Sequence, residues 1–237
     1  MNNKNKKKSR QHELFASFKA NSEKMTFSVV DGKLYAFSDK GEVELQNCTL
    51  TNSYQRDNPA KPNKVINMVS ADSNSFSLYE IFKDAGVVYA VDTNTKKENP
   101  GFFSICVIIK GEFNRNDNEG FSINYFPEKV ITSYNEYQHP LIEQFCWKGA
   151  IEYIQSQLPD SNKKVVLIVD CDLQNIGLMN ERKKPIVDNF YLPPNFTLLY
   201  ASSDVGKEFL PNKMIALSDK LANELYNSEY KNRNDKS

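Results

Sequence analysis

Short apolar runs and amphipathic segments alternate along residues 86–230. Apolar runs of strand length predict strands at residues 87–92, 102–111, 120–126, 163–170 and 196–202. One of these runs, VVLIV, shows no polar alternation, which is typical of a strand covered on both faces. Apolar residues that recur every three or four positions predict helices at residues 139–158 and 214–226, and a weaker helical pattern spans residues 178–190.

This order of elements predicts an α/β fold. Three strands without an intervening helix are followed by units in which strands and helices alternate, which implies a mixed five-stranded sheet flanked by helices. The polar stretch TNTKKENPG after the first strand reads as a loop. The short stretch rich in Asn, Asp and Gly between the second and third strands suits a hairpin.

The first 85 residues carry a different pattern. Alternating apolar positions between residues 25 and 50, with Asp31-Gly32 at the turn, predict a β-hairpin. A loop with two prolines spans residues 52–64, and a short helix at residues 77–86 is expected to end at Gly86. This β-rich region either extends the main sheet or forms a lobe that recognises a substrate or a protein partner.

These patterns divide the chain into four parts. We expect a disordered basic tail at residues 1–12, the β-rich region at 13–85, the main domain at 86–230 and a disordered tail at 231–237. No apolar stretch is long enough for a membrane span or a secretory signal, so we expect a cytoplasmic protein without a membrane partner.

Composition narrows the possible chemistry. The formal net charge is zero, so the molecule as a whole has no field that would attract a polyanion. Four cysteines without a CxxC pair are expected to be reduced thiols rather than a zinc site or disulfide framework. Two histidines and the absence of glycine-rich phosphate-binding motifs leave little support for triad catalysis or a nucleotide-binding loop.

Four acidic residues stand where packing alone explains little. Asp92 and Asp170 end predicted strands, at the edge where sites form in parallel sheets. Glu143 lies early in its helix on the face that carries Trp147, and Asp219 interrupts the apolar stripe of the last helix. Each has an ordinary explanation, such as a turn, a helix cap, the helix macrodipole or a salt bridge.

Taken together, the four acids favour a cation site. A carboxylate on an apolar face costs several kcal/mol unless it is neutralised, paired or bound to metal. Two carboxylates about 4 Å apart repel by roughly 4 kcal/mol at an effective dielectric near 20. Oxygen ligands select hard cations, so we expect Mg²⁺ or Mn²⁺ rather than zinc.

The motifs around these acids resemble those of ribonuclease H-like nucleases, over roughly residues 86–228. In that superfamily an Asp on the first strand, a Glu on the first helix, an Asp ending the fourth strand and an Asp on the last helix hold two metal ions. The matching motifs here are YAVDTN with Asp92, IEQFCWKGAIEYI with Glu143, LIVDCD with Asp170, and LSDKLA with Asp219.

The resemblance implies a ribonuclease H-like fold and hydrolysis of phosphodiester bonds in RNA, DNA or a hybrid, assisted by two Mg²⁺ or Mn²⁺ ions. Asp172 is an alternative ligand to Asp170, because both lie on one strand face. Lys207 or Lys213 is expected to contact the substrate where many family members carry a His, unless the enzyme does without such a residue. The alternatives are a non-catalytic module of this fold that binds nucleic acid or protein, and a strand-transfer enzyme, which the lack of DNA-binding domains disfavours.

Overall fold

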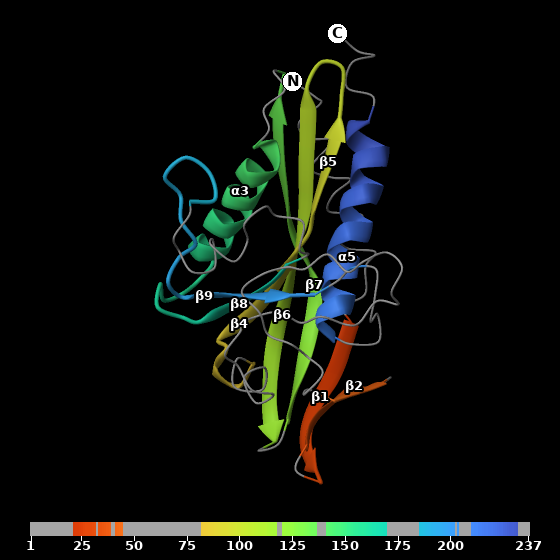
Figure 1. Ribbon diagram of the computed structural model, residues 1–237, viewed down its shortest axis with the longest axis vertical. Helices are drawn as coiled ribbons and strands as arrows, with labels where there is room; N and C mark the ends of the chain where they lie inside the picture. Colours follow the sequence, from red (N-terminus) through yellow and green to blue (C-terminus); the bar gives the residue numbers. More distant parts are fainter. Residues whose placement is uncertain are drawn as a thin grey trace.

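The computed structural model describes residues 21–31, 33–38, 41–44, 82–117, 120–136, 141–169, 185–201, 203 and 210–231. These residues form an α/β fold in which helices flank a mixed sheet (Figure 1), as the polarity pattern predicts. The tail expected at 1–12 lies outside the described residues, as does the one at the C-terminus except for its first residue. In the described part of the chain, no helix is long and apolar enough to cross a membrane.

The sheet is larger than expected, because the described residues contribute nine strands to it. Their bounds are β1 (Asn21–Val30), β2 (Lys33–Ser38), β3 (Gly41–Glu44), β4 (Val87–Val91), β5 (Thr93–Lys97), β6 (Phe102–Asp117), β7 (Gly120–Asn135), β8 (Val165–Val169) and β9 (Phe196–Tyr200). The order across the sheet is β3-β2-β1-β7-β6-β4-β8-β9, and β5 pairs with β6. The β4-β8 and β8-β9 pairs are parallel and the other pairs are antiparallel.

Three strand predictions need correction. Residues 93–97, expected in a loop, form β5, because the polar threonines and lysines of this segment are suited to a partly exposed edge strand. The strands expected at 102–111 and 120–126 both continue to 16 residues, as β6 and β7. The tip of this long hairpin reaches beyond the helices (Figure 1), and the part of β7 that pairs with β1, residues 120–125, lies within the strand already expected.

Two helices cover opposite faces of the sheet (Figure 1): α3 (Ile142–Ser156) and α5 (Leu210–Leu225). The side chains of β4 alternate between them. Val88 and Ala90 pack in the cluster that contains the apolar face of α5, whereas Tyr89 and Val91 pack in the cluster that contains α3. Burial of β4 on both faces explains why its sequence is uniformly apolar.

The helix boundaries differ modestly from those expected. The last helix begins four residues earlier, at Leu210, and continues into a π-helical turn at Tyr226–Tyr230. The weaker helical pattern at 178–190 is wrong where it is described, because Val187 and Phe190 form an isolated β-bridge. Of the helix expected at 77–86, residues 82–84 are helical and 77–81 lie outside the described residues.

The N-terminal region extends the main sheet. Antiparallel pairing joins β1 to β2 through the predicted turn, where Asp31 adopts a positive φ of 50°. On its other side β1 pairs with β7, and the mostly buried carboxylate of Glu23 on β1 forms an ion pair with Lys213 on α5. Of the two roles considered for residues 13–85, the described strands therefore show the extension of the sheet.

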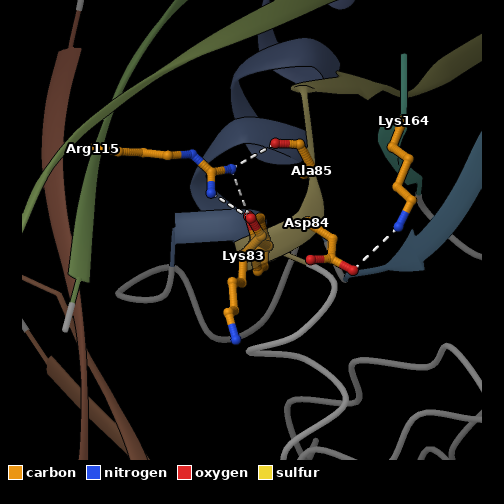
Figure 2. Close-up of polar contacts among 6 residues, drawn as sticks. Lys83, Asp84, Ala85, Arg115 and Lys164 are labelled. Carbon is orange, nitrogen blue, oxygen red and sulfur yellow. Dashed lines mark hydrogen bonds and ion pairs between the residues drawn. The ribbon is translucent and has the colours of Figure 1, made fainter. Parts of the chain in front are cut away.

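Arg115 on β6 fixes the segment that leads into β4. Its guanidinium donates hydrogen bonds to the carbonyl oxygens of Phe82 (3.0 Å), Ala85 (2.5 Å) and Lys83 (Figure 2). The same group lies 4.8 Å from the centre of the Phe113 ring. Three carbonyls at the end of a helical turn thus share one planar donor, which sets the start of β4 against the long hairpin.

We expect Arg115→Ala to lower the free energy of unfolding by about 1–2 kcal/mol, because it removes these hydrogen bonds and the ring contact. Urea denaturation followed by circular dichroism measures the change. Lys164→Ala is the control, since its ion pair with Asp84 (Figure 2) joins side chains that are 66% and 55% exposed. It should cost no more than about 0.5 kcal/mol. Equal losses in the two variants would contradict the role assigned to Arg115.

Candidate functional site

Asp92 lies at the junction between β4 and β5. Both strands pair with β6, and their pairing keeps the same register across the junction. Ala90 stands opposite Ile109 and Thr93 stands opposite Cys106, so the chain advances three residues on each strand. By the same count Asp92 stands opposite Val107. The two strands are therefore one long strand that is interrupted at the predicted site residue.

The hydroxyl of Ser218 fills this interruption. The backbone N–H of Asp92 donates a hydrogen bond of 2.9 Å to Ser218 Oγ, and that hydroxyl donates one of 2.6 Å to the carbonyl of Val107. The Ser218 side chain is fully buried. A side chain of α5 thus bridges the backbones of two neighbouring strands, next in sequence to Asp219.

Glu143 reaches the same junction from the other face. The hydroxyl of Thr93 donates a hydrogen bond to Glu143 Oε1, in the first turn of α3. The prediction that Glu143 shares its helix face with buried apolar residues is confirmed, because Trp147 and Ala150 are buried on α3. The side chain of Thr93 therefore ties the end of the central strand to α3.

Asp219 is held by two side-chain amides. Asn94 on β5 and Asn223 one helical turn further along α5 donate hydrogen bonds of 2.9 Å and 2.8 Å, both to Asp219 Oδ1. The expected position beside the buried stripe is confirmed, because Ile215 and Ala222 are fully buried while Asp219 is only partly buried. Residues 92–94 thus contact both helices that carry predicted site residues.

The described pairing of β4 with β8 ends at this junction. Val91 pairs with Val169 at the last position of the β4-β8 ladder, and within the described residues β5 pairs only with β6. Strand alternation places Asp92 and Asn94 toward α5, and Thr93 toward α3. Glu143 and Asp219 therefore reach the junction from opposite faces of the strand.

Two predicted ligands lie outside the described residues, namely Asp170 and its alternative Asp172. Asp170 directly follows Val169, whose partner Val91 directly precedes Asp92. Within the described residues, no group of three His, Cys, Asp or Glu side chains has the spacing of a metal site. Asp92, Glu143 and Asp219 provide the all-oxygen chemistry that Mg²⁺ and Mn²⁺ require, but these three do not complete such a group.

The structure bears differently on the two lysines that were expected to contact a substrate. Lys207 lies outside the described residues. Lys213 is described, and its ammonium pairs with Glu23, with the two side chains 14% and 10% exposed. The structure therefore gives Lys213 a partner within the protein, and its contact with a substrate stays a prediction.

Two buried thiols lie beside the junction. Cys106 is the strand partner of Thr93, and Cys146 lies on α3 three residues after Glu143. Both are free and fully buried, and Cys146 Sγ lies 3.6 Å from the carbonyl oxygen of Ile131, to which it donates. A hydrogen bond with Cys146, together with burial, raises the pKa of the Cys106 thiol well above its usual range.

Sequence reasoning missed the polar residues that surround the acids: Thr93, Asn94, Ser218 and Asn223. The alternation of TNT after Asp92 is a strand signal that a reading of the segment as a loop discards. The spacing of Asn223 from Asp219 is that of neighbours on one helix face. Ser218 has no such signal, because its role depends on pairing between segments more than one hundred residues apart.

Comparison with known proteins adds no relative to this description. No protein-family model, no curated protein and no solved structure matches the chain.

We expect Ser218→Ala to lower the free energy of unfolding by about 1–3 kcal/mol. The substitution leaves a buried N–H and a buried carbonyl without the hydroxyl that joins them. Chemical denaturation measures the loss, and hydrogen exchange of the Asp92 amide should become faster. Unchanged exchange at Asp92 would contradict the bridging role.

Thr95→Ala is the control for this experiment. Thr95 also joins neighbouring strands, by a hydrogen bond of 3.1 Å from its hydroxyl to Ser104 Oγ, but its side chain is exposed. Water can replace this bond, so the loss should be less than about 1 kcal/mol. If Thr95→Ala lowered the free energy of unfolding more than Ser218→Ala does, the special role of the buried Ser218 bridge would be contradicted.

The thiol of Cys106 should resist alkylation in the folded protein at pH 8. Its raised pKa keeps it protonated there, and only the thiolate is the effective nucleophile. Treatment with iodoacetamide, followed by peptide mass spectrometry, should show modification of Cys106 only after unfolding in urea. Raising the pH to 9 should increase the labelling of Cys106 in the native protein only slightly. Rapid labelling of Cys106 in the native protein would contradict the expected protection.

Proposed function

We propose that the protein is a divalent-metal-dependent nuclease with a ribonuclease H-like core. The observation that carries this proposal is that Glu143 and Asp219 accept hydrogen bonds from Thr93 and Asn94, the two residues that follow Asp92 at the end of the central strand. The strand order supports it. In the resembled superfamily, three antiparallel strands come first and the last two strands run parallel to the first, as β4, β6, β7, β8 and β9 do.

The position of Asp92, just past the last described pair of the β4-β8 ladder, supports the same proposal. In the proposed site, Glu143 from one face of the strand and Asp219 from the other serve a common set of ions beside Thr93 and Asn94. Asp170, the fourth acid of the motif set, follows Val169 in the sequence, and Val169 pairs with Val91, the residue before Asp92. In α/β sheets, sites form beyond the carboxyl ends of the strands.

In this proposal each described acid has a distinct position. Asp92 is fixed by its backbone on the strand, Glu143 by the hydroxyl of Thr93, and Asp219 by two amides. Mg²⁺ or Mn²⁺ ions held by these carboxylates with Asp170 would lower the pKa of an attacking water and stabilise the leaving oxygen of a phosphodiester. The substrate is RNA, DNA or a hybrid.

Asp92→Asn and Asp219→Asn should each reduce Mg²⁺- or Mn²⁺-dependent cleavage of labelled oligonucleotides by at least about 100-fold. The loss is expected because each replaces a carboxylate ligand by a weaker neutral one. A panel of single-stranded RNA, single-stranded DNA, duplex DNA and RNA/DNA hybrid serves as substrate, with both metals tested.

Asp84→Asn is the matched control, because Asp84 is exposed and pairs with Lys164 (Figure 2) before the start of β4, whereas Asp92 follows the end of that strand. This variant should cleave like the wild type, and thermal melting shows whether each variant is folded. Wild-type protein that binds an oligonucleotide but cleaves none of the four forms would favour a non-catalytic binding module and contradict the nuclease.

A further inference from the structure

Both amide donors at Asp219 contact the same carboxylate oxygen. Asn94 Nδ2 and Asn223 Nδ2 lie 2.9 Å and 2.8 Å from Oδ1. Among the described residues, Oδ2 receives no such donor. Within the described residues this carboxylate is therefore asymmetric, because both donors contact one of its two oxygens.

The two donors come from different elements, which fixes the carboxylate against rotation. Asn94 belongs to β5 and Asn223 to α5, and the hydroxyl of Ser218 attaches α5 to the strand one residue before Asp219. Rotation of the carboxylate would break hydrogen bonds to both a strand and a helix. The oxygen that faces away from the amides is therefore the one available to a ligand.

The number of oxygens that a carboxylate can offer affects which cation it suits. Mg²⁺ requires a near-ideal octahedron and takes single oxygens from carboxylates, and Mn²⁺ shares its preference for hard oxygen ligands. Ca²⁺ accepts six to eight oxygens and often takes both oxygens of one carboxylate. A carboxylate with one oxygen engaged by two amides is a poorer ligand for Ca²⁺ than a free one.

We propose that Asn94 and Asn223 are positioning residues that restrict Asp219 to one available oxygen and so favour Mg²⁺ and Mn²⁺ over Ca²⁺. This inference depends on the proposed metal site. It assigns to the two amides a role in cation selectivity that is separate from the role of the acids as ligands. The two asparagines act through Asp219 and do not themselves touch the ion.

The test measures metal binding by the full chain, without any substrate. Mn²⁺ affinity is measured by electron paramagnetic resonance, and Ca²⁺ affinity by its competition with Mn²⁺. In Asn94→Ala and Asn223→Ala, Mn²⁺ affinity should fall by about tenfold, the range found when a residue that orients a ligand is removed. Ca²⁺ affinity should fall less or rise, so the Mn²⁺/Ca²⁺ affinity ratio drops by at least about threefold.

Two further variants serve as controls. Asn195→Ala removes an amide whose hydrogen bond of 3.0 Å goes to the carbonyl of Lys163, away from Asp219, and should leave the ratio unchanged. Asn223→Gln keeps an amide on the same helix face as Asp219 and should restore most of the Mn²⁺ affinity. Thermal melting without metal shows which variants fold. If Asn94→Ala does not fold, the Asn223 pair of variants decides the question.

The outcomes separate this inference from the proposed function. Wild-type binding of Mn²⁺ with an unchanged Mn²⁺/Ca²⁺ ratio in the folded alanine variants would overturn the role of the amides and leave the nuclease standing. An equal loss of Mn²⁺ and Ca²⁺ affinity in these variants would also overturn the role of the amides and leave the nuclease standing. Wild-type protein that binds neither cation would overturn the proposed metal site and this inference with it.

Discussion

The hydrogen bonds of the Ser218 hydroxyl are the constraint on which the rest of the site depends. They join the N–H of Asp92 to the carbonyl of Val107, at the one position where the long central strand is interrupted. A helix that packs through apolar side chains alone can slide or rotate on a sheet with little change in buried area, because apolar contacts are not directional. A buried hydroxyl with two backbone partners removes that freedom. The position of Asp219 relative to Asp92 therefore follows from a polar contact within a core built mainly of apolar side chains.

Residues 92–94 contact both helices that carry predicted site residues, α3 and α5. Strand alternation sends Thr93 to α3 and Asn94 to α5, so a single short segment determines how both helices present their acids. The proposed site lies beside the last described pair of the β4-β8 ladder, Val91 with Val169.

Much of this fold could be predicted from the sequence, because a strand that is buried on both faces has a uniformly apolar sequence, and a helix that is buried on one face has periodic apolar residues. The uniformly apolar β4 and β8 and the periodic α3 and α5 were all expected near their observed bounds. Edge strands and strand extensions carry no such pattern, which is why the sequence predicts a loop at β5 and an end of β7 nine residues early. For the site, acids at strand ends and on helix faces could be recognised individually. The polar groups that orient them could not, since their partners come from distant parts of the chain.

The attachment of the N-terminal strands has a practical consequence for studying the core alone. A shortened protein that starts at residue 86 would contain every motif of the resemblance. It would also lack Glu23, leaving the ammonium of Lys213 mostly enclosed on α5 without its counter-charge. The edge of β7 that β1 covers would be bare, and a long unpaired strand edge promotes aggregation. Loss of activity in such a truncation would therefore reveal damage to the scaffold, and says nothing about whether the removed segment touches a substrate.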